Sequence, residues 1–195
     1  MLPPISFFCY ETGRSLFSLG FRVRPILKAL DLPEEKTRIL DAACGFGYFY
    51  RHVRACDYTG IDNDRERIDW AKSLYGENEN RRFLLGDVCE TGLPSKSFDR
   101  GLGYGILHHL DDVQVKRFLA EINRLVKGPI VFSDPVYSRY HVINNLLCRL
   151  DRGRYVRRAE AYLELCRPFL QIKKTEFFYA RNGLAKFFLM TCLPK

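Results

Sequence analysis

The sequence lacks the patterns that mark disulfide-rich, zinc-binding or membrane-spanning proteins. Its seven cysteines are scattered and never spaced as C-x-x-C, and their odd number also argues against a disulfide framework. No apolar run approaches the roughly 20 residues that cross a bilayer. Because the sequence also shows no signal peptide, we expect a reduced, cytoplasmic protein that holds no metal.

Two signatures of nucleotide chemistry are missing as well. The G-x-G-x-x-G fingerprint of dinucleotide-binding folds does not occur, which counts against a nicotinamide oxidoreductase. No Asn/Asp-Pro-Pro-Tyr sequence is present, and few aromatic residues accompany the basic run at 149–158, which counts against a nucleic-acid substrate. The formal net charge of +8 instead favours an anionic small molecule or an acidic surface.

The stretch from 38 to 50 predicts a buried strand, a tight turn and the start of a helix. Asp41 closes the strand, and the small residues Ala43, Gly45 and Gly47 follow at every second position. Glycine lets the backbone approach a ligand closely and take a positive φ, and a helix N-terminus presents free N–H groups to an anion. An ordinary strand-to-helix turn would share this pattern. The next acidic strand end, Asp62, favours a binding site, because its distance along the chain suits a carboxylate that holds ribose hydroxyls.

Four segments in order resemble the successive motifs of class I S-adenosylmethionine-dependent methyltransferases. They are DAACGFG at 41–47, GID at 60–62, LGDV at 85–88 and FDRGLGYGILHHL at 98–110. The resemblance implies that S-adenosylmethionine is the cofactor and that it contacts residues at the four strand ends, namely Asp41, Ala43, Gly45, Gly47, Asp62, Asp87, Val88 and Tyr104. Ala43 departs from the motif, since the family usually has its first glycine there, and we expect a slightly tighter turn. Asp87 has a second interpretation as a turn residue.

The pattern of elements predicts a single α/β domain over 1–195. We expect a Rossmann-like, doubly wound sheet of seven strands, mostly parallel, with an antiparallel final strand. An N-terminal helical segment, 1–36, would contain a helix over 13–30 that packs at the sheet edge and over the cofactor; contact of this basic helix with a membrane surface is the alternative. Helices are expected over 64–75 and 111–127, a helical cap insert over 136–167, and a closing hairpin of 169–179 and 185–193.

Polar residues near the predicted strand ends supply the candidates for catalysis and acceptor binding. The catalytic candidates are His108, His109, Asp134 and His141, although a structural role for the histidine pair is the favoured alternative. The acceptor candidates lie in the cap insert and are Tyr137, Tyr140, Arg152, Arg154 and Arg157. Their arginines suit a carboxylate or phosphate, but a solvated basic loop would read the same way. Gly103 and Gly105 indicate close approach of a ligand.

The function that this resemblance implies is methyl transfer to a small-molecule acceptor. The sequence leaves open whether the acceptor atom is oxygen, nitrogen or carbon. A nicotinamide-dependent oxidoreductase and a non-catalytic, methyltransferase-like partner subunit are the alternatives. No obligatory nucleophile or metal is implied, because the cofactor itself carries the reactive group.

Overall fold

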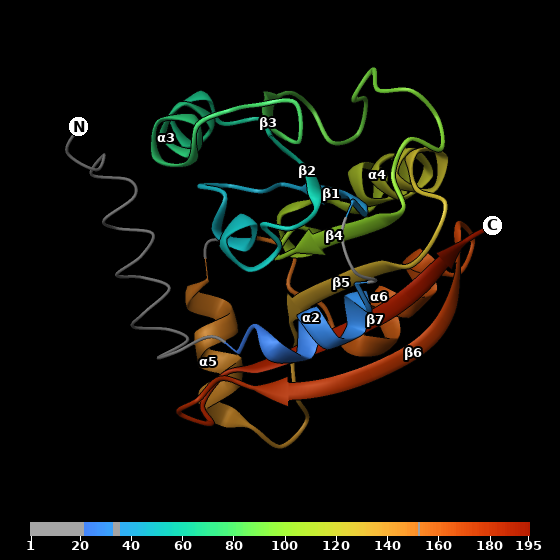
Figure 1. Ribbon diagram of the computed structural model, residues 1–195. Coiled ribbons are helices and arrows are strands. Elements are labelled where there is room, and N and C mark those ends of the chain that lie inside the picture. The colour runs from blue at the N-terminus through green and yellow to red at the C-terminus, as the bar shows by residue number, and fades with distance from the viewer. Residues whose placement is uncertain (1–21, 33–35, 152) are drawn as a thin grey trace.

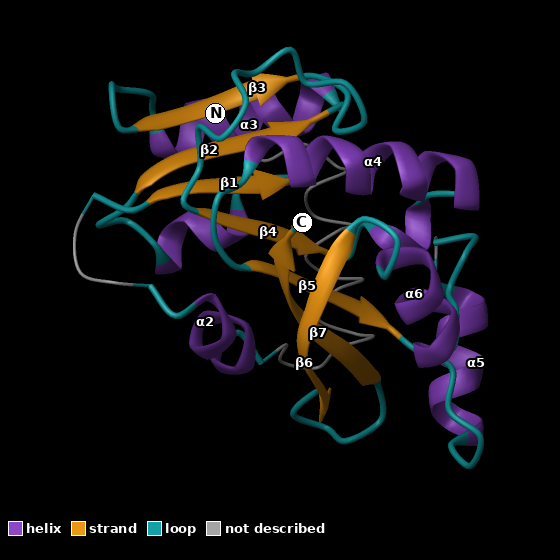
Figure 2. Cartoon of the chain, turned by 90° about the vertical axis from the view of Figure 1, so that its right-hand side faces the viewer, coloured by secondary structure: helices purple, strands orange, loops and turns teal. Residues whose placement is uncertain are grey.

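The computed structural model describes residues 22–32, 36–151 and 153–195. A seven-stranded sheet has the order β3-β2-β1-β4-β5-β7-β6 (Figures 1 and 2). The strands are β1 (Arg38–Ala42), β2 (Asp57–Asp62), β3 (Arg81–Leu85), β4 (Arg100–Tyr104), β5 (Ile130–Pro135), β6 (Leu170–Tyr179) and β7 (Lys186–Pro194). The first five pair in parallel, and β7 runs antiparallel to both β5 and β6. The predicted sheet is therefore confirmed.

Helices cover both faces of this sheet. They are α2 (Arg24–Leu30), α3 (Arg65–Tyr75), α4 (Asp112–Leu125), α5 (Val142–Leu150) and α6 (Ala159–Cys166), with two short 3-10 helices, η1 (Tyr48–His52) and η2 (Leu107–His109). Residues of α4 and α6 pack together in one core, whereas α2, η1 and α3 pack in cores on the other face. Among the described residues, no helix is long and apolar enough to cross a membrane.

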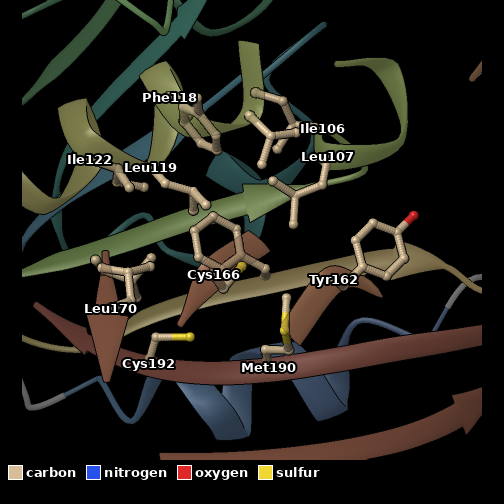
Figure 3. Packing of buried hydrophobic residues seen from close by; sticks show 14 of the residues in the cluster. Ile106, Leu107, Phe118, Leu119, Ile122, Tyr162, Cys166, Leu170, Met190 and Cys192 are labelled. Atoms are coloured by element: carbon tan, nitrogen blue, oxygen red, sulfur yellow. The ribbon is translucent and has the colours of Figure 1, made fainter. Parts of the chain in front are cut away.

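The helix α4 shows how the sequence specifies the larger core. Asp111 forms a capping box with Gln114: its carboxylate accepts from the Gln114 N–H, and the Gln114 side chain accepts from the Asp111 N–H. The apolar residues then recur every three or four positions and are buried, at Val115, Phe118, Leu119, Ile122 and Leu125. Figure 3 shows Phe118, Leu119 and Ile122 packed with residues of α6 and β7.

Two local predictions differ from the structure. The aromatic stretch after Gly47 forms only the short 3-10 helix η1, so the expected helix N-terminus for anion binding is not there. The helix α2 begins at Arg24 and places Ile26 and Leu30 in a core with residues of β4, β5 and β7, so it covers a sheet face rather than the edge. Residues 13–21 of the predicted helix lie outside the described residues.

Candidate functional site

The turn after β1 has left-handed backbone geometry at three positions. The φ angles are 61° at Ala43, 54° at Gly45 and 73° at Gly47. A Cβ at Gly47 would come within 2.9 Å of the Phe83 ring, so this glycine is needed for core packing. A Cβ at Gly45 would meet no atom within 4 Å. Gly45 therefore exposes its backbone to open space, as close approach by a ligand requires.

The carboxylate of Asp62 lies directly beside this turn. One oxygen accepts from the Gly45 N–H at 2.9 Å, and the other accepts from the Asp64 N–H at 3.0 Å. The residue is 3% exposed, and the guanidinium of Arg67 lies 3.9 Å away. These bonds join the ends of β1 and β2 and hold the carboxylate in one orientation. Each oxygen keeps a lone pair that can accept from a ribose hydroxyl, so the residues fit the cofactor that the motifs imply.

Asp41 has a partner that the motifs do not reveal. Its carboxylate accepts a hydrogen bond from the Tyr58 hydroxyl at 2.6 Å, and the residue is 1% exposed. Complete burial raises the pKa of Asp41 to about 7, against the effect of the Tyr58 bond, and the charge of Asp62 adds to the increase. Asp41 is therefore partly protonated near neutral pH.

The other predicted cofactor residues follow the ends of β3 and β4. Asp87 is exposed, and its carboxylate accepts a hydrogen bond from the Cys89 N–H at 2.8 Å. Asp87 is therefore a turn residue, as its alternative interpretation predicts. Val88 packs partly against the larger core, and the Tyr104 ring lies edge-on to Phe49. Gly103 has a packing role instead of a ligand role, because a Cβ there would come within 2.7 Å of Phe132.

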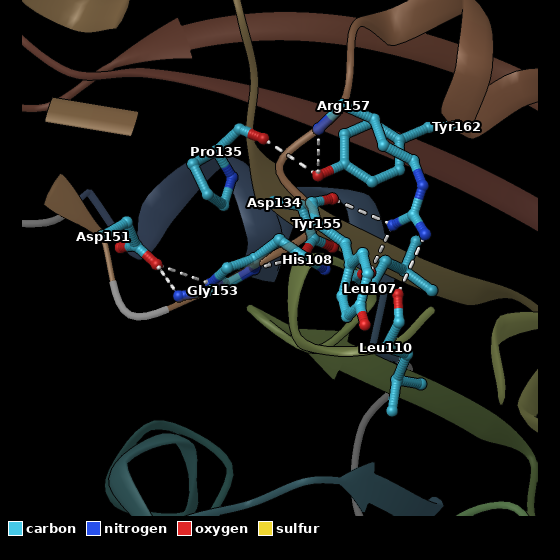
Figure 4. A network of polar contacts seen from close by, with 10 residues as sticks. All are labelled: Leu107, His108, Leu110, Asp134, Pro135, Asp151, Gly153, Tyr155, Arg157 and Tyr162. Carbon is cyan, nitrogen blue, oxygen red and sulfur yellow. Dashed lines mark hydrogen bonds and ion pairs between the residues drawn. The ribbon is translucent and has the colours of Figure 1, made fainter. Parts of the chain in front are cut away.

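A polar cluster fills the space between the carboxyl ends of β4 and β5 (Figure 4). His108 Nδ1 lies 2.7 Å from Asp134 Oδ1, and its Nε2 lies 3.3 Å from Asp151 Oδ1. The main-chain N–H of His108 also donates to Asp134. Burial alone would lower the pKa of His108, but the bonds and charges of Asp134 and Asp151 outweigh it and raise that pKa to about 9. His108 is thus an imidazolium at neutral pH.

Of the remaining catalytic candidates, Asp134 and His109 lie in this polar cluster and His141 lies outside it. Asp134 Oδ2 is buried and has no hydrogen-bond partner among the described residues. The His109 ring lies tilted against the His108 ring, with 4.1 Å between the ring centroids. Desolvation together with the His108 charge lowers the pKa of His109 to about 4. His141 stands apart at the start of α5, with its Nε2 3.3 Å from the Tyr179 hydroxyl.

Arg157 has a structural role that the sequence does not reveal. All five of its guanidinium N–H donors are used, because it bonds to the Asp112 carboxylate and to the carbonyls of Leu107, Leu110 and Tyr155. Its side chain is 10% exposed. These bonds fix the cap insert to the loop before α4, and in this arrangement they leave Arg157 no free N–H for the expected contact with an acceptor, which stays a prediction.

The other acceptor candidates are less constrained. Tyr137 is half-buried and donates its N–H to the Arg157 carbonyl, whereas Arg154 is exposed. Tyr140 is 83% exposed, so its side chain points into solvent. Arg152 lies outside the described residues.

Sequence reasoning missed several residues that hold the cap insert in place. The Tyr162 hydroxyl donates to the Pro135 carbonyl at 3.1 Å and accepts from the Arg157 N–H. Gly153 lies so close to His108 that a Cβ there would overlap the imidazole ring. The only sequence signal for this junction was the D-x-G pattern at 151–153, which is typical of a turn.

Comparisons with known proteins agree with this geometry. Residues 39–128 match a family model described as a methyltransferase domain. A search of curated proteins finds no match. Among solved structures, a chain of the Haloferax volcanii complex between the Trm112 methyltransferase activator and a methyltransferase is 16% identical, with a TM-score of 0.76 over 97% of this chain and 95% of that one.

Two further solved structures are those of named methyltransferases. A TehB-like S-adenosylmethionine-dependent methyltransferase from Corynebacterium glutamicum is 22% identical, with a TM-score of 0.69 over the full length of both chains. Geranyl diphosphate C-methyltransferase from Streptomyces coelicolor, in complex with S-adenosyl-L-homocysteine, is 13% identical, with a TM-score of 0.70 over 89% of this chain and 75% of that one. These likenesses establish the fold. Together with the family match, they show that residues 39–128 form a methyltransferase domain, with the fold of S-adenosylmethionine-dependent methyltransferases.

Proposed function

We propose that this chain transfers the methyl group of S-adenosylmethionine to a small-molecule acceptor. The observation that carries the proposal is the buried Asp62 carboxylate, fixed by the Gly45 N–H beside an open turn. This arrangement supplies a charged acceptor for ribose hydroxyls. Next to it lies the main chain of Gly45, which has no side chain to keep a ligand away. When bound, the cofactor supplies a methyl group on a positively charged sulfur.

The chain's own residues would position both molecules. Asp62 would accept from the ribose, exposed Asp87 and the Val88 N–H would contact the adenine, and Tyr104 would lie beside the reacting carbon. Asp41 would support the turn from behind. Since methyl transfer is an in-line displacement, orientation and exclusion of water are the main requirements.

The charges in the polar cluster favour different roles for the two histidines. His108 is a poor general base because it already carries a proton at neutral pH, so we assign it the positioning of the cap insert through Asp151. His109 is neutral at that pH and exposed, and it would accept a hydrogen bond from the acceptor. Asp134 Oδ2, which has no hydrogen-bond partner among the described residues, would remain available to accept one further hydrogen bond. Arg154 and Tyr137 are the cap residues proposed to contact the acceptor, preferably an anionic one.

A two-step experiment tests this proposal. The full chain is first titrated by calorimetry with S-adenosylmethionine, S-adenosylhomocysteine and NAD, and we expect the first two to bind and NAD not to bind. Methyl-labelled cofactor is then incubated with the chain and pools of small molecules. Label should move to one class of acceptor, with release of S-adenosylhomocysteine in equal amount. Binding of NAD alone would refute the proposal, and cofactor binding without transfer to any pool would favour the non-catalytic alternative.

A further inference from the structure

The outer face of α5 exposes large apolar side chains. The exposed fractions are 82% for Val142, 56% for Ile143, 54% for Leu146 and 60% for Leu150. At 100° per residue these positions lie within one arc of the helix. In an ordinary surface helix such an arc faces the core. Here no element of the described chain covers it, and α5 lies at the periphery of the molecule in both views (Figures 1 and 2).

The opposite face of α5 is fixed to the domain by specific polar contacts. Asn144 is 1% exposed; its amide donates to the Val136 carbonyl at 2.8 Å, and its oxygen accepts from the Lys186 N–H at 2.7 Å. Asn145 bonds to both main-chain groups of Ser138. Rotation of the helix to bury the apolar arc would break these bonds and leave buried polar groups unpaired. The hydrogen bonds of Asn144 and Asn145 therefore keep the apolar arc on the exposed side of α5.

The charged residues along the segment that carries this arc have a single sign. Residues 135–150 contain no aspartate or glutamate, while Arg139 and Arg149 are both exposed. The next acidic residue, Asp151, is engaged with His108. A second copy of the chain would bring these arginines against each other. An apolar arc with a cationic margin instead complements a surface that is apolar inside and anionic at its boundary.

We propose that the outer face of α5 docks on an anionic membrane surface. Val142, Ile143, Leu146 and Leu150 enter the boundary between head groups and acyl chains, and Arg139 and Arg149 meet the anionic head groups. Because α5 follows β5, docking brings the carboxyl ends of the strands, where the candidate site lies, toward the lipid surface. The inference does not depend on methyl transfer or on cofactor binding.

Vesicle flotation of the full chain tests the proposal with a matched pair of variants. The vesicles are phosphatidylcholine alone, or phosphatidylcholine with roughly one third phosphatidylglycerol. Leu146→Glu alters the docking face. Leu74→Glu is the control, because Leu74 is 49% exposed and lies on α3, which packs against the opposite edge of the sheet. Cofactor titration of both variants is run in parallel and should match that of the unaltered chain, so a failure here is separate from a failure of the proposed function.

We expect the unaltered chain and Leu74→Glu to float with the anionic vesicles to within about twofold of each other, and Leu146→Glu to bind at least about tenfold more weakly. Arg149→Ala should weaken binding about fivefold on anionic vesicles only. No flotation, equal flotation with both lipids, or equal behaviour of the two leucine variants would overturn the proposal. A dimer of the unaltered chain that Leu146→Glu dissociates would also overturn it, because a second copy would then cover the face. So would an absence of flotation together with a lower melting temperature for Leu146→Glu than for Leu74→Glu, because residues 1–21 would then be the segment that covers the face.

Discussion

Removal of the His108 charge should abolish a stabilisation that depends on pH. In the folded protein the pKa of His108 rises from its ordinary 6.5 to about 9. Each pKa unit is worth about 1.4 kcal/mol, so the charged imidazole stabilises the fold by about 3 kcal/mol. Because the folded-state pKa is the higher one, this contribution is fully present below about pH 6.5 and is lost as the pH rises through about 9.

Thermal unfolding of the unaltered chain and of His108→Gln across pH 6 to 10 measures this effect. A chain of this size changes its melting temperature by about 2–4 °C per kcal/mol, so the gap between the two proteins should shrink by about 6–12 °C over the range. His141→Gln is the control, since the ring of that exposed histidine lies against Tyr179, away from the polar cluster. Parallel curves for the unaltered chain and His108→Gln would refute the assignment of His108 as a buried imidazolium.

Four other changes test neighbouring parts of the account. Gly153→Ala should lower the free energy of unfolding by about 1–3 kcal/mol in urea titrations, because its methyl group would overlap the His108 ring. Without cofactor, Asp41→Asn should be more stable than the unaltered chain at pH 8 but not at pH 4, since the raised pKa of Asp41 gives a folding cost that develops between about pH 4 and pH 7 and is fully present above pH 7. Arg157→Ala should lower the melting temperature, because it leaves four acceptors unpaired. Arg154→Ala should leave the melting temperature unchanged and raise the acceptor's KM, and the opposite pattern would contradict both assignments.

The fold could be predicted because its signals are local. The cap before α4 and the regular spacing of its apolar residues lie within one short stretch, and so do the turn at 43–47 and the acid that ends β2. Gly45 shows the value of this reasoning, because the open space beside it is what the motif predicts. Gly47 and Gly103 show its limit: their lack of a side chain serves Phe83 and Phe132, which come from other strands.

The polar cluster could not be predicted because its bonds join distant segments. Arg157 donates to a carbonyl 50 residues earlier, at Leu107, and nothing in the basic run tells such an arginine from an exposed one such as Arg154. The histidine pair looked alike in sequence. The structure separates the two, since His108 is enclosed by two carboxylates while the His109 ring remains exposed.

Calorimetric titration of Asp62→Ala with S-adenosylhomocysteine tests the central claim most directly. Asp57→Ala, at the opposite end of β2, is the matched control, and Asp62→Asn keeps the shape while removing the charge. Loss of a charge-assisted acceptor costs about 1.5–3 kcal/mol, so Asp62→Ala should weaken binding roughly 10- to 150-fold. Asp62→Asn should weaken binding to a lesser extent, and Asp57→Ala should bind like the unaltered chain. Equal affinity of the unaltered chain and a folded Asp62→Ala variant would contradict the claim that the cofactor binds beside the turn after β1.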